Sequence, residues 1–174
     1  LAVETSTLSS STHAGLSCTS CHSTITELPH EDRPAHVLCA SCHDKQVREY
    51  LTRGHGLTLG SGRTQSEACG DCHGEPHAIL PKMDPLSPVT RNNQGKTCGT
   101  CHSEAAEALA ISVHSIKSGA SIKDVPVCTD CHGKHTILPA SDPSSPVHRK
   151  AVGGTCSGCH GDPELVAKYE LSPD

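Results

Sequence analysis

Six copies of one pentapeptide, C-x-x-C-H, restrict the fold of this 174-residue chain more than any other feature. All twelve cysteines fall within these copies, in the pairs Cys18–Cys21, Cys39–Cys42, Cys69–Cys72, Cys98–Cys101, Cys128–Cys131 and Cys156–Cys159. The residue after each pair is a histidine: His22, His43, His73, His102, His132 and His160. A pattern repeated so strictly predicts six sites that share one chemistry.

The spacing of the pentapeptide suits covalent attachment of haem. Two thiols one helical turn apart can form thioether bonds to the two vinyl groups of a haem, and the next residue then offers its imidazole to the iron. Tetrahedral zinc also uses C-x-x-C pairs, but its four ligands do not explain a histidine after every second cysteine. Disulfides within C-x-x-C would close very small loops, and a thioredoxin-type motif would occur once. The pattern therefore predicts six c-type haems, with zinc and disulfides as alternatives.

Large apolar side chains are scarce. The sequence has no Phe, no Trp, two Tyr and one Met. It provides about 29 residues for each haem, fewer than the roughly 40 residues below which a domain needs extra support. Twelve Pro and 15 Gly indicate loops and short helices. We therefore expect a small, mostly irregular fold with short α-helices and little or no sheet, in which a stacked chain of haems serves as the core.

An internal repeat divides the chain. A shift of 59 residues superimposes Cys39 on Cys98 and Cys69 on Cys128, and a shift of 58 superimposes "ILPKMDPLSPV" on "ILPASDPSSPV". We predict one domain over residues 1–174, built from three two-haem units at about 13–54, 55–113 and 114–174, of which the first is shortened.

Eight histidines lie outside the pentapeptides: His13, His30, His36, His55, His77, His114, His135 and His148. Six irons with two axial imidazoles each need six of them. His55 and His114 share one repeat position, and His77 and His135 share another, so we predict that all four are distal ligands. His148 aligns with a threonine, which indicates a surface residue.

The first unit offers the remaining distal ligands. His30 follows its pentapeptide by a few residues, as the equivalent histidines of the other units do, and is preferred to His36. His13 completes the set of six. The sequence leaves open which haem each distal histidine serves. His135 follows His132 too closely to reach the opposite face of the same ring, and is expected to serve a neighbouring haem.

The repeat is irregular at both ends of the sequence. His55 and His114 each follow a pentapeptide histidine by 12 residues, but the position 12 residues after His160 is Ser172. Conversely, His13 precedes the first pentapeptide. One hypothesis is that copies of the chain join head to tail, with His13 of one copy binding a haem of the next. The alternative is that His13 folds back onto a haem of its own chain.

Three segments that follow the second pentapeptide of each unit have helical composition, at 43–54, 102–119 and 160–171. The first two are expected to end at Gly54 and Gly119. Residues 56–67 are expected to form a loop, and no strand pattern is evident.

With these motifs in place, the chain resembles the multihaem c-type cytochromes of bacteria and archaea over residues 13 to about 170. The matching stretches include "HAGLSCTSCH", "PHEDRPAHVLCASCH", "HGLTLGSGRTQSEACGDCHGEPHAIL" and "CHGKHTILPASDPSSPV". The resemblance implies bis-histidine haems in a continuous chain. It also implies electron transfer in the periplasm or outside the cell, in some members within polymerised haem wires.

We therefore expect an electron conduit with no enzymatic activity, because the histidine count leaves no obvious open coordination position. Its partners would be redox proteins and, under the head-to-tail hypothesis, further copies of itself. The alternatives are a periplasmic shuttle or subunit that serves a membrane oxidoreductase, and a multihaem reductase. The net charge of −5 disfavours nucleic acid, and the apolar stretch "AAEALAISV" is too short to span a bilayer. Thioether attachment of haem implies export to the periplasm, the cell surface or beyond.

Overall fold

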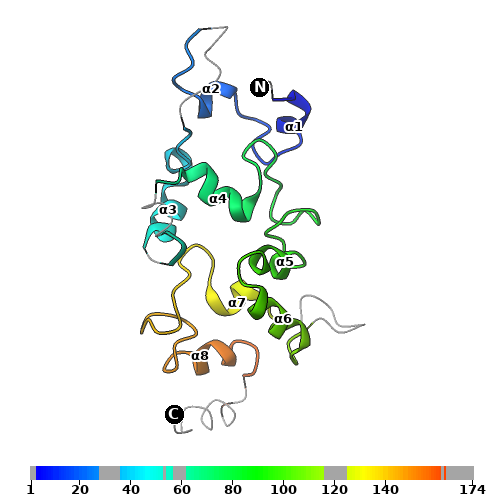
Figure 1. The fold of residues 1–174 in the computed structure, drawn as a ribbon, viewed down its shortest axis with the longest axis vertical. Coiled ribbons are helices and arrows are strands. Elements are labelled where there is room, and N and C mark those ends of the chain that lie inside the picture. The colour runs from blue at the N-terminus through cyan, green and yellow to red at the C-terminus, as the bar shows by residue number, and fades with distance from the viewer. Residues whose placement is uncertain are drawn as a thin grey trace.

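The computed structural model describes residues 3–27, 36–52, 54–56, 62–115, 125–161 and 163. This part of the chain is elongated, and its helices follow one another along the long axis in nearly the order of the sequence (Figure 1). Helices α1 (Thr5–Ser9) and α2 (Cys18–Cys21) lie near one end, and α8 (Val152–Ser157) lies near the other. The position of a motif along the chain therefore approximates its position along the molecule.

The helices between these ends are short and joined by turns. They are α3 (Ala40–Leu51), α4 (Gln65–His73), α5 (Gln94–Gly99), α6 (Ser103–Ile111) and α7 (Cys128–His132). The longest has 12 residues, and the described ranges contain no β-strand. The expected fold class, mostly irregular with short helices, is confirmed.

Two predicted helices differ from the observed ones in extent. Helix α3 begins at Ala40 rather than at residue 43, because the C-x-x-C stretch is itself helical, and it bends at His43 (φ −109°, ψ 38°). Helix α6 ends at Ile111, where Ser112 is extended, so the predicted helix to Gly119 was too long. Residues 116–119 and nearly all of the predicted helix after position 161 lie outside the described residues.

Helix α4 was not predicted, and its first residues fall in the expected loop 56–67. A capping box starts it at Thr64. The Thr64 hydroxyl accepts a hydrogen bond from the Glu67 N–H (3.3 Å), and the Glu67 carboxylate accepts one from the Thr64 N–H (2.8 Å). The sequence "TQSE" carries the S/T-x-x-E signature of this cap, and so the start of α4 was readable in advance.

Protein side chains alone form little core in the described part. Its buried hydrophobic residues are Val47, Ala68 and Val127, whereas Ile111 and Val113 remain 89% and 83% exposed. A chain of this length normally buries many more apolar side chains. Something other than these side chains must therefore supply apolar contact, as expected for a fold built around haem.

Equivalent positions of the internal repeat form equivalent hydrogen bonds. The Thr97 hydroxyl donates to the Pro88 carbonyl, and 58 residues later the Thr155 hydroxyl donates to the Pro146 carbonyl, both at 2.7 Å. Each bond ties the D-P-x-S-P-V turn to the helix that carries the next pentapeptide. The aligned sequence segments therefore adopt the same local structure.

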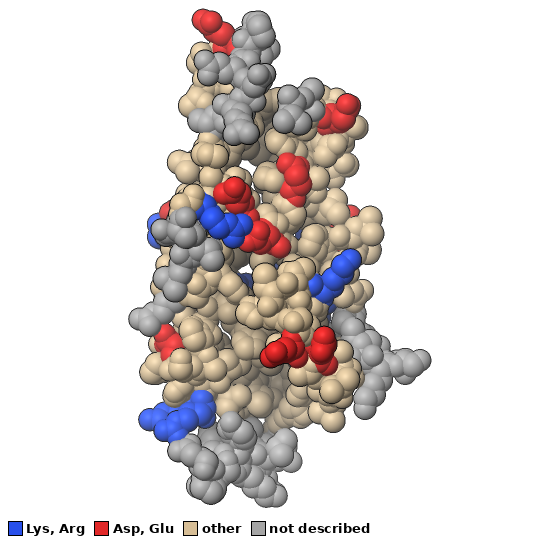
Figure 2. Space-filling view, viewed as in Figure 1, with Lys and Arg blue, Asp and Glu red and all other residues tan. Residues whose placement is uncertain are grey.

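Charged side chains of both signs are interspersed among uncharged ones on the face shown in Figure 2. None of the helices that the structure describes combines the length and apolar character needed to cross a membrane.

Candidate functional site

Each pentapeptide folds into about one turn of helix. In four of them the histidine N–H donates to the carbonyl of the first cysteine at 2.8–2.9 Å, at His22, His43, His102 and His160. This turn brings two thiols and one imidazole to the same region of the backbone. All twelve cysteines are free in the structure. The local geometry is thus compatible with two thioether bonds and one axial ligand at each pentapeptide.

Five pairs of histidine rings face each other, and each pair joins a pentapeptide histidine to one outside the motifs. The pairs and their centroid distances are His13–His43 (6.1 Å), His22–His77 (6.0 Å), His55–His102 (5.9 Å), His73–His135 (6.2 Å) and His114–His160 (6.0 Å).

These distances fit one metal ion between the two rings. A ring nitrogen that binds a metal lies about 2 Å from it, and the ring centre lies about 1 Å further away. Two imidazoles on opposite sides of one iron therefore have centroids about 6 Å apart, as all five pairs do. The described residues hold no cluster of three or more His, Cys, Asp or Glu side chains suited to one metal ion. Paired imidazoles are the ligand set of a six-coordinate haem.

The pairs contain ten of the twelve histidines that the sequence predicted as iron ligands. The eleventh, His132, makes no ring contact with another histidine of the described residues. The twelfth, His30, lies outside the described residues. Neither histidine judged spare occurs in a pair. His36 is exposed and its charge acts on Glu67, and the His148 ring accepts a hydrogen bond from the Lys150 N–H (3.3 Å).

Partner choice follows a rule that the sequence did not reveal. We number the pentapeptides one to six along the chain. The histidines of the first and third pair with a histidine that follows the next odd-numbered pentapeptide. His22 of the first, for example, pairs with His77, which follows the third. The histidines of the fourth and sixth pair with a histidine that follows the previous even-numbered pentapeptide. His102 of the fourth, for example, pairs with His55, which follows the second. Ring orientation follows the same division. The two odd-numbered pairs are nearly parallel at 20°, whereas the even-numbered pairs are inclined at 52–63°.

The second pentapeptide has no even-numbered one before it, and its partner, His13, also comes from earlier in the chain. The structure pairs His13 with His43 of the same chain, which favours the alternative in which His13 folds back. Its setting matches that of His114. The His13 N–H donates to the Ser11 hydroxyl (3.0 Å), and the His114 N–H donates to the Ser112 hydroxyl (3.1 Å). Ser112 directly follows α6 and Ser11 follows α1 after one residue, and each serine N–H donates to the carbonyl of a leucine three residues earlier, so the turn at His13 resembles the end of α6. Both histidines stand in an S-x-H sequence, and this shared motif could have indicated in advance that His13 and His114 are equivalent.

Two glutamates contact distal histidines, and the sequence prediction did not identify either. Glu75 Oε1 lies 2.9 Å from His77 Nδ1, and its Oε2 accepts a hydrogen bond from the His77 N–H (2.9 Å). Glu49 Oε2 lies 3.6 Å from His135 Nδ1. A carboxylate beside Nδ1 favours the tautomer with a proton there, which leaves Nε2 free to bind a metal. Both contacts occur at odd-numbered pairs.

Cysteines of successive pentapeptides lie beside each other. The thiols of Cys39 and Cys69 hydrogen-bond, which lowers the pKa of Cys39 to about 6 and raises that of Cys69. One repeat later, burial and then the nearby Cys128 thiol raise the pKa of Cys98 to about 11. Pentapeptides two and three, and four and five, are therefore in contact through their first cysteines.

The remaining pentapeptides influence each other electrostatically. Burial, and then Asp71 and the Cys101 thiol, raise the pKa of Cys72. Burial, Asp130 and then the Cys156 and Cys159 thiols raise the pKa of Cys131. The third pentapeptide is thus near enough to the fourth, and the fifth to the sixth, for their thiols to interact electrostatically.

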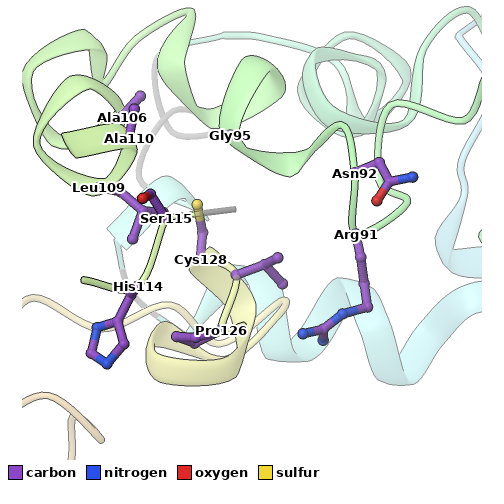
Figure 3. A pocket seen from close by; sticks show the side chains of 11 residues that line it. Arg91, Asn92, Gly95, Ala106, Leu109, Ala110, His114, Ser115, Pro126 and Cys128 are labelled. Carbon is purple, nitrogen blue, oxygen red and sulfur yellow. The ribbon is translucent and has the colours of Figure 1, made fainter. Parts of the chain in front are cut away.

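A cleft of about 250 Å³ lies beside the fifth pentapeptide. Much of its wall is apolar, from Ala106, Leu109, Ala110, Pro126 and Val127. The Cys128 sulfur points into it, and the His114 ring lies at its margin and points away (Figure 3). Apolar walls beside a free thiol suit the flat face of a macrocycle attached at that thiol. The residues present therefore fit a covalently bound haem.

A family model described as cytochrome c7 and related cytochrome c matches residues 27–103 and again residues 60–133. The two matches overlap and together span more than half of the chain. No curated protein and no solved structure matches the sequence.

Proposed function

The chain belongs to the family of cytochrome c7 and related cytochromes c, multihaem electron carriers with covalently bound haem c, and we propose that it is an electron conduit with six such haems. The five facing histidine pairs carry this proposal. Each pair offers two imidazoles at the separation that would suit one iron between them, and the six pentapeptides would supply six attachment points.

Saturated iron favours electron transfer over catalysis. A reductase needs a coordination position at which its substrate can bind, and two imidazoles on one iron leave none. Bis-histidine ligation should also hold the reduction potentials below those of haems with one Met ligand. The proposed function is therefore electron transfer without chemistry on a substrate, and a multihaem reductase is the rival.

The order of the attachment sites supports conduction along the molecule. Adjacent cysteines join the second pentapeptide to the third and the fourth to the fifth, and the helices follow nearly the same order along the long axis (Figure 1). Electrons could then enter near α2 and leave near α8, or move in the opposite direction.

Redox proteins are the partners proposed for the two ends. Further copies of the chain would extend the conduit into a filament, which suits an extracellular or cell-surface location. A periplasmic shuttle, or a subunit of a membrane oxidoreductase, is the alternative. Either location requires export, because c-type haem is attached outside the cytoplasm.

Counting haems and open coordination positions tests the proposal. Pyridine haemochrome absorbance and the intact mass should give six haems per chain, and five in a Cys156→Ser/Cys159→Ser variant. At most one reduced haem per chain should bind carbon monoxide. Fewer than six haems would contradict the hexahaem assignment, and several CO-binding haems would favour the reductase.

A further inference from the structure

The third and fourth pentapeptides share one residue in front of them. A glutamine stands four residues before the first cysteine of each, in "QSEACGDCH" and "QGKTCGTCH". These glutamines, Gln65 and Gln94, are the first residues of α4 and α5. The corresponding residue before the sixth pentapeptide is Val152, the first residue of α8, so a helix of this kind can start without a glutamine. The glutamines therefore need an explanation beyond their own helices.

Each glutamine holds a neighbouring pentapeptide. Gln65 Oε1 accepts a hydrogen bond from the N–H of Ala40, the residue after the first cysteine of the second pentapeptide (3.0 Å). Gln94 Oε1 accepts two from Thr129, the residue after the first cysteine of the fifth, one from its N–H (3.2 Å) and one from its hydroxyl (3.0 Å). All three bonds are partly buried, which shields them from competing water. The third pentapeptide is thus tied to the second, and the fourth to the fifth, at the same position.

The helices that receive these bonds have no cap of their own. The first N–H groups of a helix lack partners within it, and the side chain just before the helix commonly accepts from one of them. Before α3 and α7 that residue is Cys39 or Val127, and neither side chain caps its helix. Cys39 is a predicted attachment point, and the Val127 side chain has no polar atom. The cap comes from the helix of a neighbouring attachment site instead.

The two ties occur where first cysteines meet. The Cys39 thiol hydrogen-bonds to the Cys69 thiol, and the Cys98 thiol hydrogen-bonds to the Cys128 thiol. Haems attached at the members of such a pair would start from adjacent points of the backbone. The glutamine bond lies one residue from these points, so it restrains their separation directly.

The connection between the fourth and fifth pentapeptides has additional support. Arg91 donates to Asp130, with Nη1 3.0 Å from Oδ1 and Nη2 2.9 Å from Oδ2, and Asp130 is the residue after Thr129. Gln94 Nε2 in turn donates to the Val89 carbonyl (3.3 Å), which orients its amide. Arg91 also lines the cleft into which the Cys128 sulfur points (Figure 3). The connection between the second and third pentapeptides depends more on its glutamine.

We propose that Gln65 and Gln94 are positioning residues that fix the distance and angle between the haems of two pairs, the second with the third and the fourth with the fifth. This inference rests on the proposed hexahaem function. Electron transfer between haems weakens steeply as they move apart, and functional groups of this kind need support that holds them to within about 0.5 Å. The glutamines supply that support at the backbone, where it acts without changing an iron ligand.

Circular dichroism in the Soret band of the haem-loaded protein tests the positioning. Two haems held close together at a fixed angle give a signal with a positive and a negative lobe, and its amplitude falls when they separate. Gln65→Val should lower this amplitude, and Gln94→Val should lower it less, because Arg91 still holds Asp130. Both variants should keep the haem content and spin state of the wild type, since neither removes a cysteine or a histidine.

Two further variants separate the hydrogen bond from other effects of substitution. Gln65→Glu should retain the wild-type signal, because a carboxylate can accept the same bond from the Ala40 N–H. Gln46→Val is the matched control and should also retain it, because Gln46 is exposed on α3 and has no described side-chain hydrogen bond.

Four results would overturn the inference. They are a wild type without the two-lobed signal, a Gln65→Val variant that keeps the full signal, a Gln65→Glu variant that loses as much as Gln65→Val, and a Gln46→Val variant that does so. If Gln65→Val takes up fewer haems than the wild type, an undiminished signal in Gln94→Val overturns the inference, and a reduced one supports it. A wild-type chain with fewer than six haems would instead contradict the proposed function.

Discussion

Replacing Glu75 by glutamine should raise the reduction potential of one haem, because it removes a negative charge that favours the oxidised iron. Glu75 Oε1 lies 2.9 Å from His77 Nδ1. An iron bound at Nε2 of that ring would lie about 4 Å beyond Nδ1, so the carboxylate acts on it from about 7 Å. Coulomb attraction over that distance amounts to about 2.4 kcal/mol at a dielectric constant of 20 and about 0.6 kcal/mol in bulk water.

The solvent exposure of the carboxylate decides which of these two energies is the better approximation. The Glu75 side chain is 59% exposed, which favours the weaker end of the range. We therefore expect about 1 kcal/mol, equivalent to about 40 mV for a one-electron couple. The amide can still accept a hydrogen bond from Nδ1, so the ring orientation and low-spin state should survive the substitution.

Spectroelectrochemical titration of the haem-loaded variant measures this shift as an upward displacement of one sixth of the absorbance change. Glu107→Gln is the matched control, because it removes the same charge from an exposed position on α6 that has no described contact with a histidine ring. A titration curve for Glu75→Gln that coincides with the wild type, or moves only as far as Glu107→Gln does, would refute the role assigned to the carboxylate.

Three further predictions follow from other contacts. Thr64→Ala removes the capping box of α4 and should lower the unfolding free energy by about 1 kcal/mol, seen as a lower Tm. The control Thr52→Ala, at the C-terminal end of α3, should lower it less. His114→Ala should convert one sixth of the ferric haem to high spin by removing the partner of His160, and His148→Ala should leave the spin state of every haem as in the wild type; equal spectra for the two variants would contradict the pairing. Electron paramagnetic resonance of the oxidised protein should resolve two classes of low-spin haem, because the rings of His22–His77 and His73–His135 are nearly parallel while the even-numbered pairs are inclined; a single class would contradict these orientations.

The sequence alone was enough to predict a donor set, because the chemistry of the pentapeptide depends on local spacing. Each C-x-x-C-H places its own thiols and imidazole within one helical turn, and this needs no tertiary information. Choosing His77 and His135 as ligands also required only the repeat, and both are paired in the structure. Setting His148 aside for the same reason agrees with its hydrogen bond to the Lys150 N–H.

The partner of each histidine could not be predicted from the sequence, because pairing depends on how distant segments of the chain pack together. His22 and His77 are 55 residues apart, and no local sequence pattern around either residue identifies the other as its partner. The same limit explains why the contacts of Glu49 and Glu75 were missed. Glu49 lies on α3, but its carboxylate reaches a histidine that follows α7.

The pairing directions likewise depend on stacking. Even-numbered pentapeptides pair with a histidine from earlier in the chain, and His13 supplies the partner of the second pentapeptide through a turn like the one after α6. Odd-numbered pentapeptides pair with a histidine from later in the chain, as His22 does with His77.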